Sequence, residues 1–282
     1  MKVVVWGTRG SLASPGPDTA RYGGNTSCVE VRADDGTVLV LDAGTGIRRL
    51  GMQLPPSLPR VDLLLSHLHM DHIQGLGFFA PLQRPNMDVR IWGPPSTTLD
   101  LRSRLIRYLS PPLFPVHLRD LACCLTLQEI AGGHFDIGPF KVESGLVCHP
   151  GTTLGYRIEA GAASMAYLPD HELRLGAVSL DGDPAWISGF DLVRGVDVLI
   201  HDAQYTAAEY DGHSGWGHST TDEVVRFAAR AGVRHVVLFH HSPDHDDATL
   251  DRLVADAARL APPGLTVTAA AEGTAYTIAE TR

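Results

Sequence analysis

The sequence predicts an α/β fold built from stacked layers. Short β-rich runs alternate with amphipathic helical patterns along the 282 residues. Strand and turn patterns dominate the first part of each half of the chain, and helical patterns dominate the second part. Residues with metal-binding side chains follow directly after several apolar runs that predict buried strands. We therefore expect two packed halves whose functional side chains gather at strand ends.

The N-terminal region predicts a meander of strands. A β-rich run at 2–6 ends in the glycine-rich turn 7–11, which lacks the Gly-Lys-Ser/Thr ending of a phosphate-binding P-loop. We interpret it as a tight turn. Asp35-Gly36 predicts a hairpin between strands at 28–32 and 37–41. Asp42 then follows, and we interpret it as a structural residue that caps or braces the next turn.

Later elements alternate in the same way. A short helix is expected at 75–82, a strand at 88–92 and a helix at 99–109 capped by Ser96, and we interpret the residues around 96–125 as a short irregular insertion. Thr220 and Glu223 predict a capping box for a helix at 220–231. The remaining expected elements are strands at 140–147, 153–158, 164–168, 196–200 and 235–239, a helix at 247–260 and a hairpin at 265–278.

Length and composition indicate one soluble globular domain spanning 1–282. Hydrophobic residues make up 44% and charged residues 20% of the chain, which suits a sizeable core. No apolar run approaches a membrane span and residues 1–7 lack a signal-peptide cleavage site, so we expect a cytoplasmic protein. The four cysteines form no C-x-x-C pair and are expected to be reduced. A formal charge of −9 argues against a partner that is an extended nucleic acid.

The stretch 66–72, Ser-His-Leu-His-Met-Asp-His, follows the apolar run 61–65. Imidazole and carboxylate groups bind zinc and its neighbours among the metals. In an extended segment, His67 and His69 point to the same side and can reach one ion. Asp71 and His72 can face a second ion from the turn that follows. A solvated histidine-rich loop is the alternative, and the H-x-H-x-D-H spacing disfavours it.

Residues after other predicted strands complete a site for two divalent metal ions. We expect His67, His69 and His149 on one ion, Asp71, His72 and His240 on the other, and Asp170 as a bridge. Two ions about 3.5–4 Å apart lower the pKa of a water molecule and supply a nucleophile at neutral pH, which indicates a hydrolase. Zinc is expected, with manganese or iron as alternatives because mixed imidazole and carboxylate ligands suit all three.

The other histidines differ in what their positions in the sequence indicate. His240 is preferred to His241 because only one of two successive strand residues can face the site. His171, His201, His213 and His245 are interpreted as loop or outer residues, and His117, His134 and His235 have no functional signal. His218 lies in Gly-Trp-Gly-His-Ser-Thr before a predicted helix. From this glycine-flanked loop its imidazole can act over the ions as a general acid.

The stretch from His67 to His72, with His149, Asp170 and His240, resembles the metallo-β-lactamase superfamily over nearly the whole chain. The resemblance implies a four-layer αβ/βα sandwich with a dinuclear site at one edge of the paired sheets. Five segments are similar to the ribonuclease Z-like phosphodiesterases, namely 7–8, 91–95, 155–159, 199–203 and 217–220.

In that branch, the histidine of Gly-His-Ser-Thr contacts phosphate and an acidic residue orients it, which implies these roles for His218 and Asp202. The family usually has glutamate where Asp202 stands, and glycine where Pro169 precedes Asp170. Asp71, His218 and Asp202 are thus the expected catalytic residues.

The resemblance also bears on the substrate. Ribonuclease Z proteins that cut tRNA carry a long basic arm rich in glycine and proline, and no segment here is long or basic enough. Residues 7–11 and 22–28 instead resemble a bacterial and phage branch that includes cyclic-nucleotide phosphodiesterases, among them the anti-Pycsar enzymes. This implies a small phosphodiester substrate, a 3′,5′-cyclic nucleotide, and a homodimer.

Three alternatives stay open at this point. The first is tRNA 3′ processing, which the charge and the missing arm disfavour. The second is hydrolysis of a carboxylic ester, lactone or β-lactam, since the same ions polarise a carbonyl. The third is a non-catalytic binding module that keeps the fold, which the complete ligand set disfavours.

Overall fold

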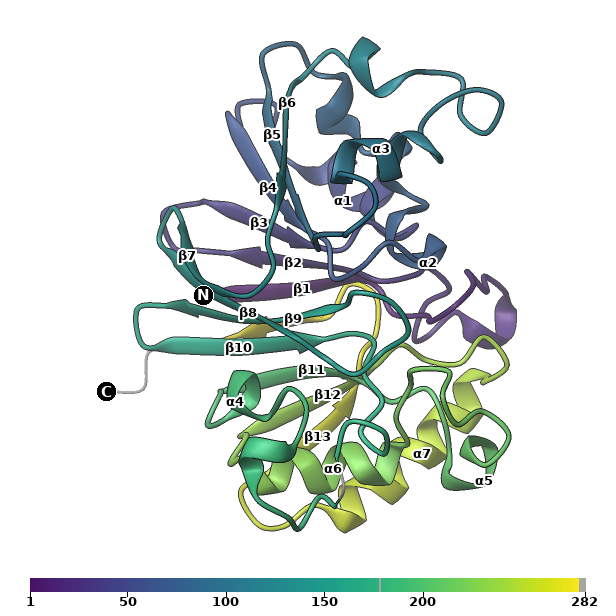
Figure 1. The fold of residues 1–282 in the computed structure, drawn as a ribbon. Coiled ribbons are helices and arrows are strands. Elements are labelled where there is room, and N and C mark those ends of the chain that lie inside the picture. Colours follow the sequence, from purple (N-terminus) through teal and green to yellow (C-terminus); the bar gives the residue numbers. More distant parts are fainter. Residues whose placement is uncertain (178, 279–282) are drawn as a thin grey trace.

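Two seven-stranded sheets pack face to face in the computed structural model, which describes residues 1–177 and 179–278. Helices cover the outer face of each sheet, so the order of layers is helix, sheet, sheet, helix (Figure 1). This is the four-layer αβ/βα architecture expected from the sequence. Residues 178 and 279–282 of the predicted domain lie outside the described residues.

The first sheet comes mainly from the N-terminal half. Its strand order is β14-β1-β2-β3-β4-β5-β6. The strands are Ala275–Thr277 (β14), Lys2–Gly7 (β1), Cys28–Arg32 (β2), Val38–Leu41 (β3), Arg60–Leu64 (β4), Asp88–Gly93 (β5) and Cys124–Glu129 (β6). The strands from β3 to β6 run parallel, whereas β14, β1, β2 and β3 pair antiparallel.

The second sheet comes from the C-terminal half. Its strand order is β13-β12-β11-β10-β9-β8-β7. The strands are Thr266–Ala269 (β13), His235–Phe239 (β12), Val198–Asp202 (β11), Ala163–Leu168 (β10), Leu154–Ala160 (β9), Phe140–Leu146 (β8) and Gly133–Ile137 (β7). Again one part is antiparallel, from β7 to β10, and the other is parallel, from β10 to β13.

The helices lie on the outer faces or at the sheet edge (Figure 1). The α-helices are Ile47–Gln53 (α1), Met70–Ile73 (α2), Leu101–Ile106 (α3), Phe190–Val193 (α4), Ala207–Tyr210 (α5), Thr221–Arg230 (α6) and Asp247–Leu260 (α7). Short 3₁₀ turns are Pro17–Thr19, Leu76–Phe78, Ala80–Gln83, Leu118–Asp120 and Pro184–Trp186.

Alternation along the strands explains the layers. On β1, Val3 and Val5 pack between the two sheets, whereas Val4 and Trp6 face the helical layer. On β10, Met165 and Tyr167 face the core between the sheets, and Ala166 and Leu168 face the outer core under α4 and α6. Because side chains alternate across a strand, a strand that is apolar at every position is covered on both faces. The apolar core between the sheets fixes how the two halves stack, and the two outer cores hold the helices on the sheets.

The predicted hairpin at 265–278 is wrong, because its two strands belong to different sheets. β13 pairs in parallel with β12, whereas β14 pairs antiparallel with β1. The chain therefore crosses from the second sheet back to the first at its C-terminal end. Local turn signals at Gly273 could not distinguish this crossing from a hairpin. Neither β6 nor β7 was predicted, since both lie in polar segments with exposed faces.

Three helix signals also need correction. Helix α3 is capped by Asp100, whose carboxylate accepts from the Ser103 N–H, and not by Ser96. The region predicted as a helix at 75–82 forms two 3₁₀ turns instead. Thr220 is the N-cap of α6, but its hydroxyl donates to the Glu223 carboxylate rather than accepting from the backbone, so the predicted capping box is absent.

The predicted insertion around 96–125 is partly helical. It contains α3 and the turn at Leu118–Asp120, and it packs over the outer core of the first sheet through Leu105 and Phe114. Over the residues that the structure describes, no helix has both the length and the apolar character that crossing a bilayer requires.

Leu39 tests the core between the sheets. It is fully buried on β3, so Leu39→Ala leaves a cavity and is expected to lower the free energy of unfolding by about 2–5 kcal/mol. Leu146→Ala is the matched control, because Leu146 is 65% exposed, and it should change this energy by less than about 0.5 kcal/mol. Urea denaturation followed by circular dichroism measures both. Equal effects of the two substitutions would contradict this packing.

Candidate metal centre

Strand ends from both sheets deliver the predicted site residues to one edge of the sandwich. His67 and His69 follow β4, Asp71 and His72 lie on α2, and His149 follows β8. The others come from the parallel part of the second sheet: Asp170 follows β10, Asp202 ends β11 and His240 follows β12. The carboxyl ends of parallel strands meet at one edge, so residues far apart in sequence gather there.

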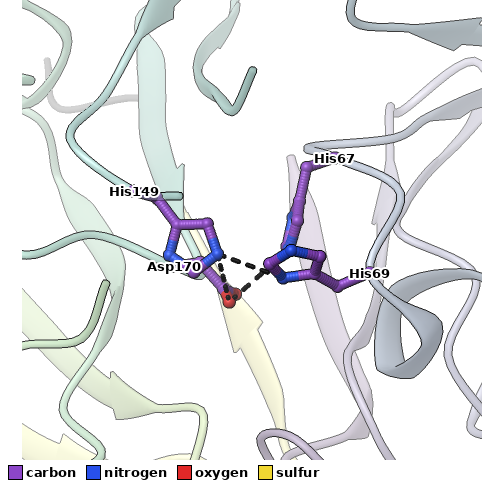
Figure 2. Close-up of side chains that lie close together, drawn as sticks. All are labelled: His67, His69, His149 and Asp170. Atoms are coloured by element: carbon purple, nitrogen blue, oxygen red, sulfur yellow. Dashed lines mark hydrogen bonds and ion pairs between the residues drawn. The ribbon is translucent and has the colours of Figure 1, made fainter. Parts of the chain in front are cut away.

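The first group of side chains comprises His67, His69, His149 and Asp170, whose ligating atoms lie within 4.8 Å of one another (Figure 2). His149 Nε2 lies 3.2 Å from His69 Nδ1 and 3.6 Å from Asp170 Oδ2, and His67 Nε2 lies 3.7 Å from the same oxygen. Four ligands placed tetrahedrally about 2.0–2.2 Å from a zinc ion are about 3.4 Å apart. The spacing suits one such ion.

The second group comprises Asp71, His72 and His240. The Nε2 atoms of the two histidines are 3.3 Å apart, and Asp71 Oδ2 lies 3.1 Å from that of His240 and 3.3 Å from that of His72. All three side chains are buried. Their atoms have the same spacing as the first group and suit a second ion.

Asp170 connects the two groups. Its Oδ2 faces the first group, whereas its Oδ1 lies 2.9 Å from His72 Nε2 and 3.3 Å from His240 Nε2. His67 Nε2 is buried and has no hydrogen-bond partner among the described residues, and the equally buried Asp170 Oδ1 contacts the two imidazole nitrogens of the second group. Buried polar atoms almost always have a partner. The donor set therefore fits two divalent cations with Asp170 between them.

The outer nitrogens of the histidines strengthen this conclusion. His72 Nδ1 donates to Asp42 Oδ2 at 2.8 Å, and His240 Nδ1 donates to Gln204 Oε1 at 2.8 Å. His149 Nδ1 donates to the Gly217 carbonyl at 2.8 Å. Each of these contacts leaves the Nε2 lone pair directed at the centre, as in metal sites where an outer acceptor fixes the tautomer. Facing lone pairs in a buried site need a cation between them.

The pKa shifts have the same origin. Burial lowers the pKa of His67 well below its usual value and keeps the ring neutral, as a ligand must be. Burial also disfavours charge on His72, but the carboxylates of Asp170, Asp71 and Asp42 outweigh it and raise the pKa of that ring well above the usual value. The surroundings of His72 thus favour a positive charge at this ring. Either a proton or a metal ion can supply that charge.

His218 lies beside both groups, and its ring centroid is 5.4 Å from that of His149 in the first group. Its Nδ1 is 2.9 Å from Asp202 Oδ2, and its ring stacks on that of His240 with centroids 4.9 Å apart. Burial lowers the pKa of His218, but the Asp202 carboxylate outweighs this and raises it to about 9. The ligating atoms of Asp170, His218 and His240 also lie within 4.8 Å of one another. Both a catalytic role and a ligand role for His218 are open to test.

The sequence profile described as "Beta-lactamase superfamily domain" matches residues 37–241, most of the chain and nearly all of the site. The chain belongs to the metallo-β-lactamase superfamily. It is similar to the uncharacterised protein Rv1339 of Mycobacterium tuberculosis, with 30% identity over 86% of this chain and 81% of that protein. It is also similar to a ribonuclease Z of Gemmatimonas aurantiaca, with 26% identity over 77% of this chain and 80% of the relative.

Solved structures share the superfamily fold. The metallo-β-lactamase fold protein YhfI of Bacillus subtilis superposes with a TM-score of 0.70 at 24% identity, covering 98% of this chain and 99% of that one. A diphosphatase of the PhnP family gives 0.68 at 20% identity, covering 99% and 98%. Yeast PDE1 gives 0.64 at 14% identity, covering 97% and 98%. The superfamily places this chain among the metal-dependent hydrolases.

Asp42 has a larger part in this superfamily site than the sequence interpretation gave it. It caps no helix; its carboxylate accepts from the Ser66 N–H, the Ser66 hydroxyl, the Tyr167 hydroxyl and His72 Nδ1 at 2.7–2.9 Å. Like the ligands, Asp42 directly follows an apolar strand, so the strand-end rule would have found it. Gln204, which orients His240, carries no such signal.

The glycine-rich turn at 7–11 also reaches the centre. The Ser11 N–H donates to Asp71 Oδ2 at 2.8 Å. A Cβ at Gly10 would lie 2.2 Å from His240 Nδ1, so only glycine fits there. Ser11, Asp42 and His240 all have positive φ, from 58° to 59°. This conformation costs a non-glycine residue about 1–2 kcal/mol, and residues that hold it cluster at functional sites.

The remaining histidines lie outside both groups. His241 Nε2 contacts the Ala270 carbonyl, which agrees with the choice of His240. His171 and His201 contact each other at 3.0 Å in the interior, and His245 contacts Glu209. His213 stacks on Tyr205. These residues serve the packing around the centre.

Asp42 is testable through metal affinity. Asp42→Asn leaves one acceptor oxygen where four donors converge, so His72 loses its fixed orientation. We therefore expect one of two zinc ions to bind about 10–100-fold more weakly. Competition with a chromogenic chelator measures the affinity. Asp62→Asn is the control, since Asp62 is equally buried but, over the part of the chain that the structure describes, its side chain accepts hydrogen bonds from Arg60 and Trp92 and from no residue of the centre. Wild-type affinity in Asp42→Asn would refute the assignment.

Proposed function

We propose that the chain is a dinuclear metal-dependent phosphodiesterase that hydrolyses a small phosphodiester, and that its substrate is a 3′,5′-cyclic nucleotide. The observation that carries this proposal is the pair formed by His218 and Asp202 beside the two ligand groups. An imidazole held by a buried carboxylate can supply a proton to a leaving oxygen. A phosphodiester has a leaving oxygen that needs a proton.

The ligand groups supply the metal chemistry. His67, His69 and His149 would hold one ion, Asp71, His72 and His240 the other, and Asp170 would contact both. When bound, two such cations lower the pKa of water and stabilise charge on phosphoryl oxygens. The expected native metal is zinc, and manganese or iron suit the same ligands.

His218 and Asp202 move the proton. Asp202 accepts from His218 Nδ1 at 2.9 Å, which fixes the ring and leaves Nε2 for the substrate. Asp202 is completely buried, and the His171 N–H and Gln204 N–H also donate to it, so its position is fixed. We infer that the Asp202 carboxylate keeps the His218 ring protonated beforehand, and that Nε2 then gives its proton to the leaving ribose oxygen, which leaves the ring neutral.

Several observations support a small substrate. The formal charge of −9 disfavours a long polyanion. A cleft of about 250 Å³ opens beside His67 and His69, and Ser96, Arg104 and Thr152 contribute to its wall. The PhnP-family diphosphatase and yeast PDE1 share the fold. We also propose that the chain forms a homodimer.

Turnover of purified protein loaded with zinc or manganese tests the proposal. Bis(p-nitrophenyl) phosphate and a panel of purine and pyrimidine 3′,5′-cyclic nucleotides are the substrates, and hydrolysis to nucleoside monophosphates is the expected result. If no phosphodiester is cleaved although elemental analysis finds two metal ions per chain, the proposal fails.

Assays of the same purified, metal-loaded protein on other substrates distinguish the competing functions. Similarity to a ribonuclease Z favours tRNA 3′ processing as the second candidate, and precursor tRNA cleaved in preference to cyclic nucleotides would establish it. Hydrolysis of a β-lactam or lactone without phosphodiesterase activity would indicate carbonyl chemistry. Stoichiometric binding of a nucleotide without product would indicate a binding module.

His218→Ala tests the proton donor. We expect turnover of a cyclic nucleotide to fall about 10²–10⁴-fold with unchanged metal content, as for loss of a general acid. His134→Ala is the control, since His134 is exposed on β7, and it should keep full activity. Loss of a metal ion in His218→Ala would instead make His218 a ligand, which its distance to Asp170 and His240 also allows.

A further inference from the structure

Glu172 is a buried carboxylate that lies two residues beyond the bridging Asp170. It is 1% exposed. Its Oε1 accepts from the Tyr210 hydroxyl at 2.5 Å and from the Gly215 N–H at 2.8 Å, and its Oε2 accepts from the Gly217 N–H at 2.7 Å. None of these partners is a predicted metal ligand, so binding a cation does not explain why this charge is buried.

The two N–H groups that donate to Glu172 show which segment of the chain it holds in place. Gly215 and Gly217 lie in the loop that ends in His218, and both have positive φ, 88° and 95°. Their N–H groups converge on the two oxygens of one carboxylate, while Trp216 between them is 61% exposed. Glu172 thus fixes the loop backbone from the interior on both sides of Trp216.

The opposite side of this loop contacts the metal centre. The Gly217 carbonyl accepts from His149 Nδ1 at 2.8 Å, and a Cβ at Gly217 would lie 2.1 Å from the same nitrogen. The His149 ring therefore packs directly on the Gly217 backbone. The segment 215–217 is therefore held by Glu172 on one side and contacts the His149 ring on the other. His218 is the next residue of the same segment.

The segment that carries Glu172 makes further contacts with this loop. The Ser219 hydroxyl donates to the His171 carbonyl at 2.5 Å, and the Leu173 N–H donates to Ser219 Oγ at 3.1 Å. The His171 N–H donates to Asp202 Oδ2, the oxygen that His218 also contacts. The segment 170–173 is thus bonded to the chain on both sides of His218.

We propose that Glu172 is a positioning residue that, through Gly217, sets the orientation of His149 toward the first metal ion and the location of His218 over the centre. The part concerning His218 rests on the proposed function, whereas the part concerning His149 depends only on the metal site. A carboxylate is required because three donors converge on it. Glutamine offers one acceptor oxygen and an NH₂ group, so at least one loop N–H would face another donor.

Glu172→Gln tests the proposal by metal affinity and by kinetics. We expect one of two zinc ions, that of the group containing His149, to bind about 10–100-fold more weakly in competition with a chromogenic chelator, while the other keeps its affinity. The kcat for a cyclic nucleotide should fall with little change in KM. A residue that only stabilises the fold would not weaken one ion selectively.

Glu223→Gln is the matched control. Glu223 is also buried and lies on α6 near the same loop, but it accepts from Arg174 and Thr220 and from no residue of the segment 213–218. This variant should bind both zinc ions and turn over substrate like the wild type. Equal metal affinities and equal kcat in Glu172→Gln and Glu223→Gln would overturn the proposal.

Tyr210→Phe provides a second test should Glu172→Gln fail to fold. It removes one of the three donors and keeps the carboxylate, so a smaller, several-fold loss of affinity for the same ion is expected, and wild-type affinity there would count against the proposal. Metal affinity is measured without substrate. Its result therefore decides the role of Glu172 toward His149 even if no phosphodiester proves to be cleaved.

Discussion

The centre depends on one buried carboxylate between two sets of imidazoles. Asp170 directs one oxygen to the His67, His69 and His149 group and the other to His72 and His240. Burial disfavours its charge, but His240, His72 and His67 outweigh this and lower the pKa of Asp170 well below its usual range. A buried negative charge surrounded by imidazole nitrogens is an arrangement that divalent cations would complete.

This constraint explains the surrounding architecture. Ligands from both sheets must reach Asp170, so the two halves stack with their strand ends at one edge, and the apolar core between the sheets fixes that alignment. Around the predicted ligands lies a second set of groups that fix three of the five rings: Asp42 for His72, Gln204 for His240 and the Gly217 carbonyl for His149. Positive φ at Asp42 and His240 shows that the backbone accepts strain to hold these positions.

In the proposed mechanism, the loop that carries His218 would link metal binding to proton transfer. Gly217 contacts a ligand of the first group, and the next residue is the proposed proton donor. A shift of this short segment would therefore disturb both functions at once. Such coupling gives a physical reason for a buried glutamate that does not itself touch the centre.

The sequence by itself determined most of the strands, because side-chain alternation and apolar runs are local, and it identified the candidate ligands, because their spacing and their position after strands are visible in the chain. It could not show that β13 and β14 belong to different sheets, since a turn signal is the same in both cases. Only the tertiary structure showed which groups contact Asp42, Gln204 and Glu172. The contacts of Asp42 with His72, of Gln204 with His240 and of Glu172 with Gly217 join residues 30, 36 and 45 positions apart. Such pairings arise from the stacking of sheets and loops, about which local spacing carries no information.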